Sequence, residues 1–206
     1  MIVVGDSGSA AAKIDELARL ISDVAARTPA EHDASPTASG KRGAAPSGRA
    51  SEVASAKEIA LRRVDRRDYS RGELTDYLVR KRQLDPGIVA EILDRFVEVG
   101  IVDDARFARN WAQERARTRR LSRRAISREL SVRGVSEELI EIALDQISPD
   151  DERQAALELC RIKARRLHGV DRQVALRRLS GQLARRGYST GVAMPVIFQV
   201  LDELAE

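Results

Sequence analysis

The strongest constraint on the fold of this chain is a helix-turn-helix pattern that occurs three times, at a period of about fifty residues. A helical unit of this size cannot bury its own apolar stripe, so neighbouring units stack and share a core. The register therefore predicts an all-α tandem array rather than one globular enzyme core. The equivalent apolar positions are Leu74, Ile126 and Leu179; Leu78, Leu130 and Leu183; Ile88, Leu139 and Val192; and Leu93, Leu144 and Ile197.

The charge of the chain alternates in step with this repeat. The net charge is +8 over residues 106–133, −7 over residues 134–160 and +8 over residues 161–186. Each repeat is therefore expected to have two basic helices followed by an acidic one. Because a given face of every unit lies along one side of a stacked array, we expect the arginines to form a long stripe.

The composition favours a polyanionic or strongly acidic partner. Of the 206 residues, 33% are charged and 43% are apolar, and an aromatic share of 3% predicts a mostly aliphatic core. Arginine accounts for 31 of the 36 basic residues, and the sequence pI is about 9.6. The arginine bias of a GC-rich genome is the alternative explanation, but it does not account for the clustering into blocks.

The single cysteine, Cys160, excludes an intramolecular disulfide and a cysteine-based zinc site. It follows Leu159 on the expected buried side of a helix, so we interpret it as a small core residue rather than a reactive thiol. The sequence has no apolar run of about eighteen residues and no signal-peptide pattern. We therefore expect a cytoplasmic protein that does not enter the membrane.

The first part of the chain differs in composition from the rest. Residues 1–55 are predicted to be an N-terminal extension, with a short amphipathic helix from about Ala11 to Ala26. Residues Arg27 to Ser55 are rich in Ala, Ser, Pro and Gly and are predicted to be a disordered linker. The three repeats are then expected at residues 56–104, 105–148 and 149–206.

Helix boundary signals recur within the repeats. Ser70 with Glu73 is typical of a capping box, in which the hydroxyl and the carboxylate each bind a backbone N–H. Gly100 and Gly134 are placed to end helices, and Gly134 is expected in the left-handed conformation. Further predicted helix starts are Asp85 before Pro86, Asp103 with Asp104, Ser122, Ser136, Ser148 before Pro149, and Asp171.

Pro195 does not fit this pattern. It lies about six residues after Ser189, the predicted cap of the last helix, where a proline lacks the helical N–H and its ring disturbs the preceding turn. Either the helix kinks at this point or it begins at Met194 and Pro195. The late start is the interpretation that we favour.

Two motifs have both a functional and a structural interpretation. The carboxylates of Asp103 and Asp104 are compatible with a metal site but lack the ligand number that Ca²⁺ or Mg²⁺ needs, which favours helix capping. Phe107 and Trp111 are compatible with stacking on nucleobases, but their spacing of four favours packing in the core. With no Gly-rich phosphate loop and no nucleophile beside a base, we expect no catalytic, metal or cofactor site.

Four segments carry a resemblance to a known family: ALRRVDRRDYSRGEL at 60–74, GIVDDARFAR at 100–109, ELSVRGV at 129–135 and LARRGYS at 183–189. In order and spacing they resemble the signature segments of the RecX family, regulators of the recombinase RecA. The resemblance extends over about residues 57–204, and VDDARFA at 102–108 is its most specific part. Two departures concern local helix geometry: Ser122 and Ala125 replace a glycine-rich opening common in the family, and Pro195 is unusual.

The resemblance implies a non-enzymatic protein of three tandem three-helix units, elongated and curved, that lies in the groove of a RecA filament on single-stranded DNA. Family members restrain filament growth and so lower the strand-exchange, coprotease and ATPase activities of RecA. The expected role is therefore in DNA repair and the SOS response, as a monomer without cofactors. The alternative is an independent nucleic-acid-binding module that acts by occupying single-stranded or duplex DNA through its basic face.

The candidate partner-binding residues are arginines of the two strongest basic blocks, because the planar guanidinium binds carboxylate or phosphate at two points. The alternative for each of them is an ion pair with an acidic helix of the array, which contributes little to stability. The candidates are Arg115, Arg117, Arg119, Arg120, Arg123, Arg124, Arg165, Arg166, Arg177 and Arg178.

Overall fold

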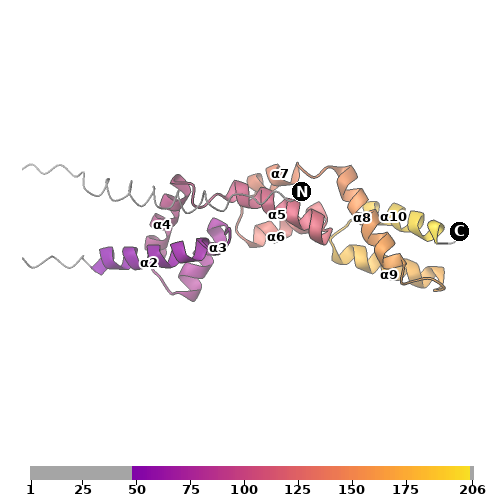
Figure 1. The fold of residues 1–206 in the computed structure, drawn as a ribbon, viewed down its shortest axis with the longest axis horizontal. Helices are drawn as coiled ribbons and strands as arrows, with labels where there is room; N and C mark the ends of the chain where they lie inside the picture. The colour runs from indigo at the N-terminus through magenta and orange to yellow at the C-terminus, as the bar shows by residue number, and fades with distance from the viewer. Residues whose placement is uncertain (1–47, 205–206) are drawn as a thin grey trace, which may run out of the picture. The chain divides into compact units, whose positions relative to one another are not determined.

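The computed structural model describes residues 48–204, and the regular structure in this range is entirely helical (Figure 1). The predicted amphipathic helix from Ala11 to Ala26 and most of the predicted linker lie outside the described residues. None of the helices in residues 48–204 is both long enough and apolar enough to cross a membrane.

The helices group into three consecutive repeats, as the apolar register predicts. Repeat 1 contains α2 (Gly48–Val64), α3 (Arg71–Thr75) with its π-helical continuation η1 (Asp76–Lys81), and α4 (Pro86–Glu98). Repeat 2 contains α5 (Asp104–Arg119), α6 (Arg123–Val132) and α7 (Glu137–Leu144). Repeat 3 contains α8 (Pro149–Ala164), α9 (Arg172–Arg185) and α10 (Thr190–Glu203). The all-α fold class, with tandem three-helix repeats, is confirmed for the described residues.

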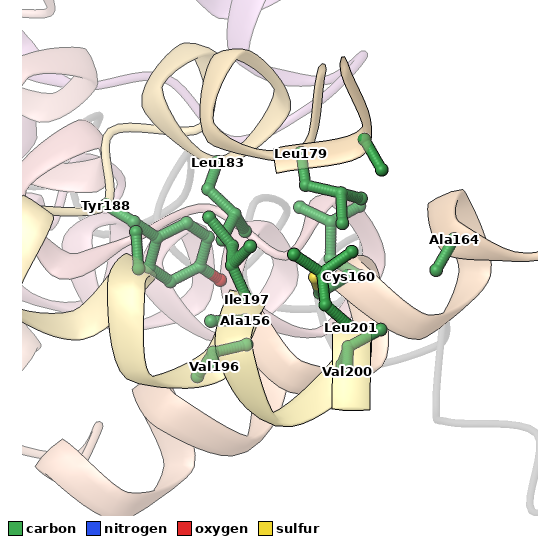
Figure 2. Packing of buried hydrophobic residues seen from close by; sticks show 13 residues of the cluster. Ala156, Cys160, Ala164, Leu179, Leu183, Tyr188, Val196, Ile197, Val200 and Leu201 are labelled. Atoms are coloured by element: carbon green, nitrogen blue, oxygen red, sulfur yellow. The ribbon is translucent and has the colours of Figure 1, made fainter. Parts of the chain in front are cut away.

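Each repeat has its own apolar core, built around two positions of the sequence register. In repeat 3, the leucines of α9 pack against Ile197 and Leu201 of α10 and Cys160 of α8 (Figure 2). Full burial of one such side chain contributes about 2 kcal/mol, so these positions fix the second helix of each repeat against the other two. The second-helix residues at these positions are at most 1% exposed in all three repeats: Leu74, Ile126, Leu179, Leu78, Leu130 and Leu183.

Helix α2 begins at Gly48, so the predicted disordered linker, which extends to Ser55, is wrong for residues 48–55. This segment contains alanine and glutamate, which favour helix, and Val53 packs against the core of repeat 1. Because α2 packs against α4, the first helix extends beyond the point where apolar periodicity becomes visible in the sequence.

Side-chain caps fix the predicted helix starts. The side chain of Ser70 accepts a hydrogen bond from the N–H of Glu73 at 3.0 Å. The predicted capping box is nevertheless incomplete, because the Glu73 carboxylate pairs with Arg67 and Arg133 rather than reaching back to the cap. Side chains that cap the other helices are those of Asp85, Asp103, Ser122, Ser136, Ser148, Asp171 and Ser189.

Repeat 1 has one residue more in its second helix than the other repeats, and a π-helical turn accommodates it. Six positions separate Leu78 from Leu84, whereas five separate the equivalent residues of repeats 2 and 3. The N–H of Arg82 binds the carbonyl of Tyr77, five residues back, at 3.1 Å. Gln83 then takes the left-handed conformation, with φ 57°, that glycines take in the other repeats. The turn before α4 therefore keeps the geometry of its equivalents.

The late start that we favour for the last helix is wrong. Helix α10 begins at Thr190, directly after the Ser189 cap, and Pro195 lies inside it on its exposed side. The proline removes one helical hydrogen bond. The residues around it, Ala193 and Val196, are buried against the rest of repeat 3. Packing of α10 against α8 and α9 therefore outweighs the cost of the missing bond.

Replacing Pro195 with alanine should stabilise the protein. The change Pro195→Ala restores an N–H donor in an exposed position of the helix, and we expect the free energy of unfolding to rise by about 1 to 3 kcal/mol. Urea unfolding followed by circular dichroism measures this change. Pro195→Gly restores the same donor in a poorer helix former and should give a smaller gain. A loss of stability in both variants would contradict the assigned helix.

The thiol of Cys160 should make stability depend on pH in the alkaline range. The residue is 1% exposed, as expected of a core position, and burial, together with the charge of Glu203, raises the pKa of its thiol from 9.0 to about 11. Between pH 9 and about 11 the thiol is ionised in the unfolded chain but not in the folded one, so stability should fall as the pH rises through this range. Cys160→Ala should lack this part of the dependence. Coinciding pH profiles for the two proteins would contradict the shift.

Candidate interaction surface

Consecutive repeats meet where the start of one second helix contacts the end of the next. Between repeats 1 and 2, the hydroxyl of Ser70 donates to the carbonyl of Arg133 at 2.6 Å. Gly72 lies so close to this turn that a Cβ atom there would approach the Arg133 carbonyl oxygen to 2.5 Å and the Gly134 Cα to 2.7 Å. There is therefore room for backbone alone between the two repeats at this point.

The junction between repeats 2 and 3 joins the equivalent segments through different atoms. The N–H of Ser122 binds the carbonyl of Arg186 at 3.0 Å. A Cβ atom on Gly187 would approach the Cβ of Ala125 to 2.7 Å. Ser122, like Ser70 in repeat 1, is at most 1% exposed and caps its second helix. Ala125 stands where a glycine-rich helix start is common in the family that the sequence resembles. The absence of a side chain at Gly187 leaves room for it.

In repeats 1 and 2, a carboxylate at the start of the following repeat accepts the first N–H of the second helix. The N–H of Arg71 donates to Asp104 at 2.7 Å, and the N–H of Arg123 donates to Glu152 at 2.9 Å. Burial raises the pKa of the Asp104 carboxyl, although the Arg71 N–H and charge act in the opposite direction. Asp104 thus joins two repeats. Within residues 48–204, no group of three or more His, Cys, Asp or Glu side chains is placed to hold a metal ion.

Trp111 contacts two arginines near the junction of repeats 1 and 2. The guanidinium carbons of Arg115 and Arg133 lie 3.9 Å and 3.8 Å from its ring centroid. Its indole N–H donates to Glu129 at 2.9 Å, and its ring stacks on Phe107 with centroids 5.5 Å apart. Phe107 is buried, and Trp111 is partly buried against the core of repeat 2. The predicted core packing of this pair is confirmed, and arginines cover the exposed part of the tryptophan.

These arginine contacts continue into repeat 1. The Glu73 carboxylate lies 3.6 Å from Arg133 of repeat 2 and 3.3 Å from Arg67 of repeat 1. The Arg67 guanidinium in turn lies 3.6 Å from the ring centroid of Tyr69. Burial lowers the pKa of Arg133, although the charges of Glu73 and Glu129 oppose this effect. Guanidinium groups that are desolvated and stacked in this way stabilise the junction between the two repeats, and we do not expect them to bind another molecule.

Three of the ten candidate arginines are engaged within the fold. Arg115 pairs with Glu129 at 2.9 Å, and its side chain is 11% exposed. Arg120 adopts a left-handed conformation at the end of α5 and pairs with Glu158 at 3.2 Å. Arg123 donates to a carbonyl group in the loop after α7 at 2.8 Å. These three arginines therefore make contacts within the fold, as the alternative interpretation of the sequence predicted.

The other seven candidates are exposed, and none of them forms an ion pair with another described residue. Three of them line a hollow of about 440 Å³ on α8 and α9, and Arg119 lines a second hollow of about 400 Å³ at the junction of repeats 2 and 3. Arg117 lies apart, in a hollow that it shares with acidic residues of α8. Arg124 and Arg165 line neither basic hollow. The seven are Arg117, Arg119, Arg124, Arg165, Arg166, Arg177 and Arg178.

Three further cations belong to this region and were not singled out from the sequence. Lys163 and Arg185 line the larger basic hollow, and Arg185 and Arg186 line the one that contains Arg119. All three lie in the basic block of residues 161–186, and this block was the only indication of them in the sequence. Net charge alone does not show which faces of the helices are exposed. Because Arg185 borders both hollows, they form one mainly basic surface of repeats 2 and 3: Arg119, Lys163, Arg166, Arg177, Arg178, Arg185 and Arg186. Glu129, which pairs with Arg115, also lines the smaller hollow, and Arg186 donates to the carbonyl of Arg119.

Tandem three-helix units joined at equivalent positions, with a mainly basic surface, define a class of helical-repeat binding proteins. Residues 56–96 match the model of the first three-helix domain of RecX, and residues 103–144 match that of its second three-helix domain. The chain belongs to the RecX family. This confirms the resemblance seen in the signature segments, which contain Ser70, Gly72, Gly134 and Gly187 of the two junctions.

Curated relatives support this membership over most of the chain. The regulatory protein RecX of Streptomyces lividans is 39% identical over 154 residues, covering 75% of this chain and 81% of that protein. The regulatory protein RecX of Thermobifida fusca (strain YX) is 41% identical over 149 residues, covering 72% of this chain and 80% of that protein. The homologues are thus named as regulatory proteins.

Solved structures support the fold. The crystal structure of RecX from Lactobacillus salivarius superposes with a TM-score of 0.65 at 18% identity, covering 73% of this chain and 97% of that chain. A second crystal structure, of a regulatory protein RecX, gives a TM-score of 0.64 at 20% identity, covering 72% of each chain. The helical-repeat fold therefore persists where little sequence identity remains.

Two glycines in helices allow a matched test of the junction. Helix propensity favours alanine over glycine by about 0.5 to 1 kcal/mol at both Gly72 and Gly181. At Gly72, however, the new Cβ would meet backbone atoms at 2.5 Å, whereas at Gly181 its nearest neighbour is the end of the Arg185 side chain at 3.5 Å. Gly72→Ala should therefore lower the free energy of unfolding by about 2 kcal/mol or more, and Gly181→Ala should raise it.

Chemical denaturation of the two variants beside the wild-type protein measures the difference. If Gly72→Ala proved as stable as Gly181→Ala, the close backbone contact between repeats 1 and 2 would not exist as described.

Proposed function

We propose that this protein is a regulator that binds in the groove of the RecA filament on single-stranded DNA. It restrains filament growth and lowers the strand-exchange, ATPase and coprotease activities of RecA, with a role in DNA repair and the SOS response. Membership of the RecX family and the regulatory names of the relatives support this proposal.

The observation that carries the proposal is the basic surface of repeats 2 and 3. Its cations form no ion pair with any described residue, and all of them except Arg186, which donates to the Arg119 carbonyl, are therefore available to an anionic partner. The junction at Ser122 and Gly187 sets the spacing between the cations of the two repeats. A filament of protein on DNA offers acidic side chains and phosphates in a regular array, and a regularly spaced set of guanidinium groups binds both.

The protein acts without catalysis or a cofactor, as a monomer in the cytoplasm where RecA works. The groups that could serve as a nucleophile support this part of the proposal. Cys160 is buried and its thiol pKa is about 11, so the reactive thiolate is scarce at neutral pH. His168 is exposed in the loop between α8 and α9 and hydrogen-bonds to no described carboxylate.

A titration of RecA ATPase on single-stranded DNA tests the proposal. ATP hydrolysis should fall as the protein is added, at ratios up to about one per RecA monomer. Arg119→Glu with Arg185→Glu reverses two exposed charges of the basic surface and should raise the half-inhibiting concentration at least about tenfold, a difference of 1.4 kcal/mol. Inhibition by that variant at the wild-type concentration would show that these arginines do not contact the partner.

A charge-matched control separates contact from net charge. Arg49→Glu with Arg153→Glu changes the net charge equally at two exposed arginines outside the basic surface. This variant should inhibit RecA like the wild-type protein. An unchanged ATPase rate at saturating wild-type protein would refute the proposed function itself.

A further inference from the structure

The larger basic hollow, on α8 and α9 of repeat 3, is lined by cations without a neighbouring acid. Its volume is about 440 Å³, and its lining contains no aspartate or glutamate. The charged residues that line it are Lys163, Arg166, Arg177, Arg178 and Arg185.

Two acidic residues of α10 neutralise other arginines of α8 and α9. Arg161 of α8 binds Glu203 at 2.7 Å, and Arg172 of α9 binds Asp202 at 2.7 Å, both on α10. The hydrogen bond and charge of Arg161 lower the pKa of Glu203, so this carboxylate is ionised and already paired with Arg161. The two helices thus carry one set of arginines paired with α10 and a second set, at the hollow, that has no ion pair among the described residues.

Gly181 lines the hollow and, because it has no side chain, leaves its floor unfilled. A glycine in the middle of a helix costs about 1 kcal/mol relative to alanine, and the equivalent positions of repeats 1 and 2 hold Asp76 and Arg128. A Cβ at Gly181 would meet no backbone, and its nearest neighbour would be the Arg185 guanidinium at 3.5 Å. Close packing therefore does not require this glycine, and a local break with helix propensity at a charged hollow indicates a functional site.

We propose that this hollow binds adjacent phosphate groups of a polynucleotide backbone. Guanidinium groups bind phosphate at two points, and the Lys163 ammonium adds a compact charge. A single strand carries one phosphate per nucleotide, so it can occupy this hollow and the neighbouring one at Arg119 together, which a free phosphate cannot. The inference assigns direct contact with DNA to repeat 3. It rests on the proposed function, which supplies the single-stranded DNA as the polynucleotide.

The test measures binding of a labelled oligothymidine of roughly 20 nucleotides to the full chain, without RecA, at about 50 to 200 mM salt. Arg177→Gln with Arg178→Gln should weaken binding at least about tenfold. It should also reduce the log–log salt slope by about 1.4, because each phosphate contact on a single strand contributes about 0.7. The matched control, Arg62→Gln with Arg80→Gln, removes two arginines that pair within repeat 1 and should bind like the wild-type protein.

A neutral variant tests the hollow apart from its charge. Gly181→Leu fills the floor, keeps every cation and replaces a poor helix former with a good one. It should weaken oligonucleotide binding several-fold while the melting temperature stays unchanged or rises. Wild-type binding by either this variant or the double glutamine variant overturns the proposal.

Competition experiments show which kind of anion the hollow prefers. At equal charge concentration, neither inorganic triphosphate nor polyglutamate should displace the oligonucleotide. Displacement by triphosphate would make the hollow a site for free phosphate, and displacement by polyglutamate would make it a site for acidic protein, so either result overturns the assignment. Since the assay contains no RecA, its failure leaves the proposed function standing, and failure of RecA inhibition leaves this site standing.

Discussion

The close contact between the second helices of consecutive repeats is the constraint on which the structure depends. At Gly72 and Gly134 the backbones of two repeats approach too closely for a side chain. At the next junction, the missing side chain of Gly187 leaves room for Ser122 and Ala125, and the Ser122 N–H binds the Arg186 carbonyl. Such contacts tolerate little rotation, because a small shift breaks a hydrogen bond to a buried serine or creates a steric clash. The spacing of every exposed cation of repeats 2 and 3 follows from this geometry.

Arginine has two distinct roles in the molecule. Near the first junction, Arg115 and Arg133 are stacked on Trp111 and paired with glutamates, where their guanidinium groups are partly desolvated. In repeat 3, Arg177 and Arg178 lie at a hollow without an acidic lining. The first group stabilises the array by combining stacking with charge, while the second carries an uncompensated charge that favours an anionic ligand.

Local chemistry made much of the fold predictable. The apolar register identified the buried second-helix positions, and short polar residues identified the helix starts, because both depend on interactions within one turn. The exceptions depend on contacts between helices. Ile140 rather than Leu139 lies in the core of repeat 2, and α10 runs through Pro195, because packing against neighbouring helices decides orientation and continuity where local signals compete.

The sequence by itself determined the number of repeats, the position of their turns and the basic character of the chain, since periodicity and charge are properties of local sequence. The tertiary structure decided which arginines are free. Arg115 and Arg119 belong to the same helix and the same basic block, yet Arg115 pairs with Glu129 and stacks on Trp111, while Arg119 is exposed and forms no ion pair with a described residue. Their difference arises from which residues of distant helices come within a few ångströms, and no local pattern contains that information.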